Sequence, residues 1–242
     1  MFRRVAVIAE GVVKELVRRK DFYLILALLI IVVIYSASFS FGGEKGFTRY
    51  FKEMGITFTY LFSVIIGVIF AARQIPQEME SKTIYPLLAH PVSRFEFILG
   101  KFFGVFLVAA VSFTVFYSIF IGSVLLRRDF STPWLLFADG YLLHLLLLSF
   151  FVSMTILLSL FLSTAANTMI TIIFYFATNW FGATLPGYIF LPHPELFDIK
   201  EKIVHTQDVI PGWVLSYLTV YAVCYTILFV ALSDLVFRKR DL

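Results

Sequence analysis

The chain has 242 residues, of which 60% are hydrophobic, 18% are aromatic and 15% are charged, with a formal net charge of +4. Soluble domains carry roughly 25% charged residues, and a soluble chain of this size buries only about 70% of the surface that it exposes when unfolded. The composition therefore predicts a membrane protein. It excludes a disordered chain, a nucleic-acid-binding domain and, with Cys224 as the single cysteine, a disulfide-stapled secreted module.

Residues 1–20 predict an amphipathic helix. Four apolar residues share one face at helical spacing, namely Val5, Ile8, Val12 and Leu16. Charged residues occupy the opposite face, as is typical of a helix that lies in the membrane interface. A cleavable signal peptide is the alternative, because residues 36–38 resemble a small-residue cleavage site, although the long periodic lead-in fits a signal poorly.

Six later segments are apolar enough to cross a bilayer as helices of about 20 residues. They cover residues 22–41, 56–72, 102–126, 135–162, 168–190 and 213–237. These segments are apolar on all sides, which favours buried or lipid-facing helices, and they lack the alternation of barrel strands. The predicted fold is an all-α membrane protein, in which six transmembrane helices follow an amphipathic interfacial helix within one domain, residues 1–242.

The basic residues set the predicted orientation. With the N-terminus inside, the inner segments hold 13 of the 20 Lys and Arg residues and the outer segments hold 7. The positive-inside rule then predicts a multi-pass protein of the cell membrane (plasma or inner membrane) with both termini in the cytoplasm. Basic clusters next to apolar runs indicate anionic lipid head groups, not nucleic acid, as the binding partner.

The predicted inner loop, residues 73–101, carries the most informative pattern. It is charged, then apolar, and it breaks at Pro91. Ser93 followed by Glu96 fits a capping box that opens the third transmembrane helix. The part before Pro91 predicts a short helix along the membrane, which a partner protein could bind in a groove; a helix that only rests on lipid is the alternative.

Polar side chains inside the spans are functional candidates, and interhelical hydrogen bonding is the alternative reading. Asp139 and His144 are five residues apart, so they do not share one helix face; we expect an interfacial Asp and a hydrogen-bonded buried His, with a proton or metal relay as the alternative. Asp234 and Arg238 predict an ion pair at a helix end. The polar outer segment matches no tight metal-ligand spacing, so no metal site is predicted.

Enzyme motifs are missing from the sequence. It contains no His-Glu-x-x-His, no Gly-x-Ser-x-Gly and no paired membrane aspartates. Gly100-Lys101 does not extend to a phosphate-binding loop, because position 95 is Phe and position 102 is Phe. No catalytic residue is predicted, and an intramembrane enzyme is the weakest of the functional readings.

Residues 78–101 follow the pattern Glu-x₃-Lys-Thr-x₃-Leu-Leu-x₂-Pro-Val-Ser-Arg-x₅-Gly-Lys. This pattern resembles the cytoplasmic-loop signature of ABC-2 type transporter permeases, the membrane subunits of type V ABC exporters. Residues 191–205 and 237–242 are similar to the outer segment and the C-terminus of these permeases. Ser81 and Pro86 depart from the residues that are usual in the family.

The resemblance implies a permease subunit of an ATP-driven exporter that forms the substrate path and couples to a separate ATPase. Two ATPase subunits, which bind ATP and Mg²⁺, and a second permease copy or a homologue would be its partners, and the chain itself would hold no cofactor. The implied ATPase-coupling residues are Glu78, Glu80, Ser81, Lys82, Thr83, Ile84, Leu87, Leu88 and Arg94. A non-transporting scaffold or assembly factor is the alternative.

Two further residue sets follow from the same resemblance. A second, smaller ATPase contact would be the turn with Ser163, Thr164 and Asn167, for which a plain hairpin turn is the alternative. The substrate path would be lined from the second and fifth spans by Thr57, Tyr60, Ser63, Thr171, Tyr175 and Asn179.

Overall fold

A computed structural model describes residues 2–20, 23, 24, 27, 28, 30, 31, 43–80, 93–126, 132–182, 192–206 and 208–239. The regular elements in these residues are all helical: α1 (Phe2–Val17), α3 (Gly43–Glu80), α5 (Arg94–Leu126), α6 (Trp134–Leu158), α7 (Thr164–Phe181), η3 (Pro194–Phe197), η4 (Lys202–Thr206) and α8 (Gly212–Arg238). The predicted all-α class is confirmed for this part of the chain.

Four helices in the described residues are long and apolar enough to cross a membrane. They are Arg49–Glu80 within α3, and the whole of α5, α6 and α8. α8 exceeds the predicted 213–237 by one residue at each end. The predicted first span, 22–41, falls largely outside the described residues. α7 has 18 residues, roughly 27 Å of helix, and the rest of the predicted fifth span, 183–190, also lies outside them, so six spans remain a prediction.

The second predicted span, 56–72, is much shorter than the helix that contains it. α3 has 38 residues and is therefore roughly 57 Å long, against a bilayer core of about 30 Å. An apolar window detects only the part of a helix that lipid can surround. The sequence predicts that the span ends at residue 72 and that a separate short helix follows along the membrane, whereas α3 continues without a break to Glu80. Lys, Glu and Gln are good helix formers, so the charged ends of α3 extend the helix.

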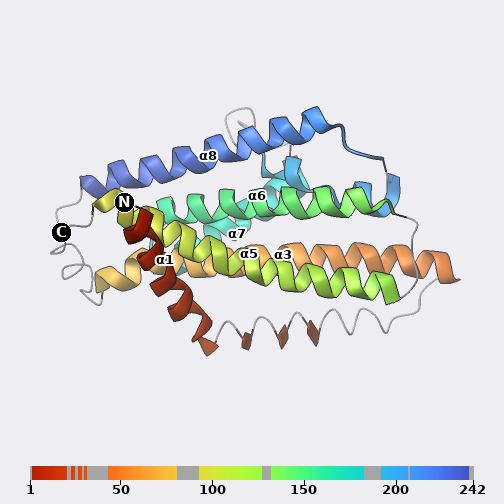
Figure 1. Ribbon diagram of the computed structural model, residues 1–242, viewed down its shortest axis with the longest axis horizontal. Coiled ribbons are helices and arrows are strands. Elements are labelled where there is room, and N and C mark those ends of the chain that lie inside the picture. Colours follow the sequence, from red (N-terminus) through yellow and green to blue (C-terminus); the bar gives the residue numbers. More distant parts are fainter. Residues whose placement is uncertain are drawn as a thin grey trace.

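The long helices lie along one another in a bundle, and α1 crosses them obliquely (Figure 1). α1 begins and α8 ends at the same end of this bundle as the end of α3 and the start of α5. Aromatic side chains fill the interior, and many of them are fully buried or nearly so, including Phe113, Phe116, Phe120, Phe150 and Phe151. Such rings supply most of the packing in a core of this composition.

A polar contact closes the opposite end of the bundle. Lys52 of α3 is only 2% exposed, and its Nζ donates to Thr132 Oγ1 at 3.0 Å. Thr132 Oγ1 in turn donates to the carbonyl of Ile203 at 3.1 Å. η4 therefore packs at this end, where Thr132 connects it to α3 next to the start of α6.

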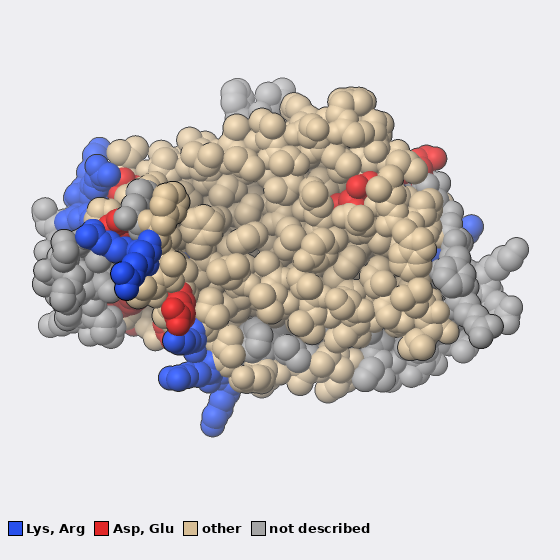
Figure 2. Space-filling model, in the orientation of Figure 1, with Lys and Arg blue, Asp and Glu red and all other residues tan. Residues whose placement is uncertain are grey.

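Charged side chains concentrate at the ends of the molecule. Figure 2 shows Lys and Arg gathered where α1 begins and α8 ends, and again where α1 ends, with a largely uncharged surface over most of the remaining length. Large apolar side chains of α8 are exposed along this surface, including Val220, Ile227 and Leu235. A long apolar band with charged ends is what a membrane-spanning bundle presents to lipid.

Candidate functional site

The candidate site lies where α3 ends and α5 begins, on either side of residues 81–92. The capping box predicted at the start of α5 is confirmed. Ser93 N donates to Glu96 Oε2 at 2.9 Å, and Glu96 N donates to Ser93 Oγ at 3.1 Å. Two donors of the first helical turn are satisfied in this way, so the chain enters α5 at a fixed angle.

A buried lysine joins the two helices at this point. Lys101 of α5 is 3% exposed, and its Nζ donates to Gln74 Oε1 at 3.0 Å and to the carboxylate of Glu78. A charge removed from water must be paired, and α3 provides both partners. The loop therefore starts and ends on two helices that are bonded to each other.

Arg94 connects the same region to α8. Its Nη1 donates to the carbonyls of Phe237 at 2.6 Å and of Arg238 at 3.1 Å, and its guanidinium carbon lies 5.6 Å from the centre of the Phe237 ring. The last carbonyls of a helix have no partner within the helix and carry a partial negative charge. Arg94 satisfies them and so attaches the C-terminal end of α8 to the first residue of α5.

The predicted ATPase-coupling residues are divided by this geometry. Glu78 and Glu80 lie in the last turn of α3, which continues from the membrane-spanning part of that helix. Ser81, Lys82, Thr83, Ile84, Leu87 and Leu88 lie outside the described residues. Arg94 and Glu78 both have partners within this chain. The predicted ion pair at the end of α8 is confirmed, with Arg238 Nη2 2.7 Å from Asp234 Oδ2.

The predicted second contact is a capped hairpin turn between α6 and α7. Ser163 is exposed and caps α7, accepting from Ala166 N at 3.5 Å, and Thr164 is half-buried. Asn167 is fully buried, and its Nδ2 donates to the carbonyl of Thr155 at 2.9 Å. The side chain of Asn167 therefore holds the hairpin together.

The predicted path residues of α3 mostly point into this chain. Tyr60 is 2% exposed, and its hydroxyl donates to the carbonyl of Gly140 at 3.2 Å. Ser63 is fully buried, and its Oγ lies 2.7 Å from His144 Nε2. Thr57 is half-buried.

The predicted path residues of α7 also include both buried and half-buried side chains. Thr171 is fully buried and donates to Asn167 Oδ1 at 3.4 Å. Tyr175 packs its ring against that of Phe151, with centroids 5.6 Å apart. Asn179 is half-buried, and its Nδ2 donates to the carbonyl of Tyr175 at 2.9 Å.

His144 is hydrogen-bonded on one side only. The Ser63 hydroxyl donates to the carbonyl of Tyr60 at 2.8 Å, so it accepts from His144 Nε2–H, and the imidazole stacks on the Tyr60 ring at 4.0 Å. Nδ1 is buried without a hydrogen-bond partner among the described residues, as is Asp139 Oδ2. No hydrogen bond or ion pair in the described part of the chain joins Asp139 to His144.

The polar segment between α7 and α8, which the sequence predicts to be outside, forms local pairs among its described residues. Lys200 Nζ lies 2.8 Å from Asp198 Oδ2, and His193 Nδ1 lies 3.4 Å from Glu195 Oε1. Within the described residues no group of three or more His, Cys, Asp or Glu side chains is arranged to hold a metal ion.

Two of the residues that connect the helices, Lys101 and Gln74, are not among the site residues predicted from the sequence. Lys101 ends the loop pattern but was not assigned a role, and Gln74 was read as part of a polar loop. Their contact joins positions 27 residues apart, and no local signal reports such a distance. A lysine between Gly100 and Phe102 was the available signal, because a charge in an apolar run implies a buried partner.

Comparison with protein families gives a match over most of the chain. The sequence model of the ABC-2 family transporter protein matches residues 15–181, which is more than half of the chain and includes α3, α5, α6, α7 and the loop. No curated protein matches the chain.

Proposed function

Because the chain belongs to the ABC-2 family of transporter proteins, we propose that it is the membrane permease of an ATP-driven exporter and couples to a separate ATPase subunit. In this proposal six helices cross the plasma membrane, α1 lies in the inner interface, and both termini are cytoplasmic. Two permease chains, identical or homologous, form the substrate path together. Two ATPase subunits bind ATP and Mg²⁺ and contact residues 78–88 from the cytoplasm.

The contact of Lys101 with Gln74 and Glu78 supports coupling most directly. It makes the end of α3 and the start of α5 one unit at the base of the loop. A protein that pushes on the loop therefore displaces two long helices together, and packed helices transmit such a push as rigid bodies. Arg94 extends the connection to α8.

The burial of the predicted path residues indicates which of their side chains are free to face a substrate. Tyr60, Ser63 and Thr171 are used inside this chain, whereas Thr57 and Asn179 are half-buried. In the assembled exporter the path therefore runs past Thr57 and Asn179, and the buried hydroxyls keep α3 and α7 in register beside it.

Purification of the full-length chain in mild detergent from its own cells tests the proposal. Mass spectrometry should identify an ATPase with a Walker motif in the complex. Replacing both Leu87 and Leu88 by Asp should remove the ATPase, because an apolar contact helix cannot seat two carboxylates in a groove. Lys239→Ala, a change at the same end of the bundle, should leave the complex intact. A wild-type complex without an ATPase, or full retention by the double Asp variant, would contradict the proposal.

A further inference from the structure

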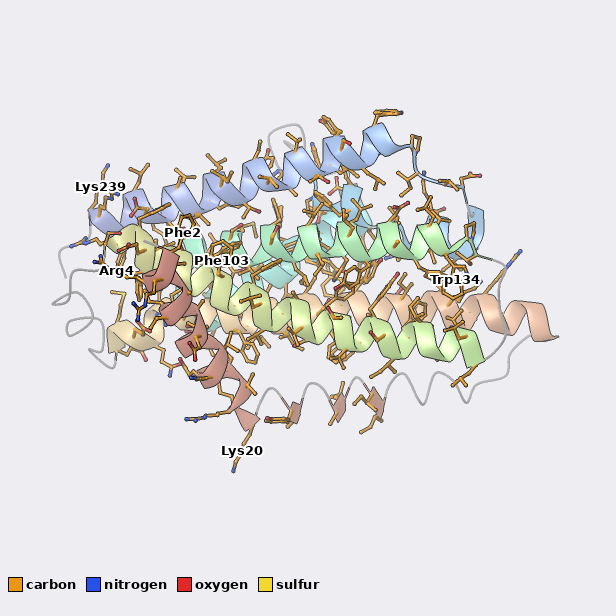
Figure 3. All side chains as sticks on the ribbon, in the orientation of Figure 1. Phe2, Arg4, Lys20, Phe103, Trp134 and Lys239 are labelled. Atoms are coloured by element: carbon orange, nitrogen blue, oxygen red, sulfur yellow. The ribbon has the colours of Figure 1, made fainter. Side chains whose placement is uncertain are left out.

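α1 is attached to both helices that border the loop. Near its start, Arg4 Nη1 lies 3.6 Å from Glu96 Oε2 at the beginning of α5. Just after its end, Arg19 donates to Gln77 Oε1 in the last turns of α3, and Arg19 Nη2 also lies 2.9 Å from Glu15. One helix of 16 residues therefore reaches from the exit of the loop to its entrance. Figure 3 shows Arg4 at the charged end of the bundle and Lys20 well away from it.

Between these contacts α1 packs tightly on α5. Gly100 and Gly104 of α5 lie under α1: a Cβ on Gly100 would be 2.6 Å from Ile8 Cβ, and a Cβ on Gly104 would be 2.6 Å from Val12 Cβ. Small residues at this spacing allow two helix backbones to approach closely. Val12 and Leu16 are at most 2% exposed. α1 and α5 therefore move as one body.

The apolar face of α1 faces protein more than lipid. The sequence places Ile8 on that face, and the half-buried Ile8 does pack against Gly100 of α5, with Ala9 buried beside it. The exposed apolar side chains of α1 are others, including Phe2 and Val7. Contact with α5 and with the loop borders, rather than with the bilayer alone, determines where α1 lies.

We propose, on the basis of the proposed function, that α1 is a brace across the loop and that Arg4 and Arg19 are its positioning residues. When the ATPase displaces the loop, α1 moves with α5. Through Arg19 it carries the movement to α3, which is a second route beside the direct contact that Lys101 makes between α5 and α3. Neither arginine contacts substrate or nucleotide in this proposal. Their role is to connect α1 to both borders of the loop, Glu96 on α5 and Gln77 on α3.

The first test uses the full-length chain alone in lipid nanodiscs, with hydrogen–deuterium exchange as the measurement. Arg19→Ala and Gln77→Leu should each speed exchange at residues 74–80 about threefold, the factor that an exposed contact of typical strength supplies. The two changes combined should add nothing, because they remove the same contact. Lys14→Ala is the matched control: Lys14 pairs within α1 with Glu10, Nζ to Oε1 2.6 Å, and this hydrogen bond lowers the pKa of Glu10.

The second test uses the complex with its ATPase, trapped with ADP and vanadate. In the wild type, and with Lys14→Ala, trapping should change exchange in α1 together with residues 74–80 and 93–101. In the double variant Arg4→Ala, Arg19→Ala the ATPase should still bind and α1 should still respond together with α5, but the response of residues 74–80 should be smaller, and Lys at both positions should restore part of it. An undiminished response of residues 74–80 in the double variant, additive effects in the first test, or no response of α1 in the wild type would overturn the brace. Failure of any ATPase to bind the wild type would contradict the proposed function instead, while the first test still decides the attachment of α1.

Discussion

Lys101 Nζ donates to Gln74 Oε1 at 3.0 Å, and this bond holds the beginning of α5 against the end of α3. The side chain of Lys101 is 4% exposed, whereas that of Glu78, its second partner, is 23% exposed. The contact therefore lies at the boundary between the apolar bundle and water. A lysine in this place is held by its partners and has few alternative positions.

Lys101→Met should destabilise the protein by about 1–3 kcal/mol, because Gln74 and Glu78 lose the donor that satisfies them. Glu78→Gln should cost less, since an amide oxygen still accepts from Lys101. Thermal unfolding in detergent measures both. Equal losses of stability in Lys101→Met and Glu78→Gln would show that the contact does not depend chiefly on the ammonium group of Lys101.

Arg94→Ala should loosen the end of α8, because two helix carbonyls lose their donor and Phe237 loses the overlying guanidinium. The measurement is the rate of trypsin cleavage after Arg238 and Lys239, which should rise in the variant. Arg94→Lys should recover only part of the protection, since an ammonium lacks the planar fork that reaches both carbonyls. Unchanged cleavage in Arg94→Ala would mean that other packing holds the end of α8.

Gly100→Ala should lower stability by about 1–3 kcal/mol, the usual cost of overpacking, because the new Cβ would overlap Ile8. Gly122→Ala, in the same helix, is the matched control: nothing lies within 4 Å of its added Cβ, and alanine favours the helix by about 1 kcal/mol over glycine. The two melting temperatures should shift in opposite directions. A shift of the same sign would show that α1 does not approach α5 as closely as described.

Ser63→Ala should cost about 1–2 kcal/mol, since His144 Nε2–H is left buried without an acceptor. Combining it with His144→Phe should restore part of the loss, because both polar partners are then gone and the ring still packs on Tyr60. Unfolding in increasing denaturant measures the stability of Ser63→Ala, His144→Phe and the double variant. If the double variant is less stable than Ser63→Ala, the imidazole of His144 has a further role in the bundle.

Single cysteines in a Cys224→Ser background test the orientation. Ser81→Cys should be protected from a membrane-impermeant maleimide in intact cells and labelled in inverted vesicles. Lys202→Cys should show the reverse, because η4 lies at the opposite end of the bundle from the end of α3 and the start of α5. Labelling of both from the same side would exclude an odd number of spans between them.

The local parts of the structure could be predicted from the sequence, and the long-range parts could not. The limits of α8 and the capping box of Ser93 and Glu96 depend on neighbours in the chain, so composition and spacing predict them. The length of α3 was missed because a hydropathy window measures the width of the membrane, not the length of a helix. The bond of Arg94 to Phe237 joins positions 143 residues apart, and nothing near Arg94 in the sequence indicates it.

The glycine pair beneath α1 also limits what the N-terminal segment can do. Lifting α1 away would open an uncovered groove over Gly100 and Gly104 and expose Val12 and Leu16, side chains that each contribute roughly 1.5–3 kcal/mol when fully buried. Neither water nor a lipid tail matches the ridge of Ile8 and Val12 that fills that groove. The segment is therefore a permanent part of the folded bundle, unlike a surface anchor that attaches and detaches as the lipid composition changes.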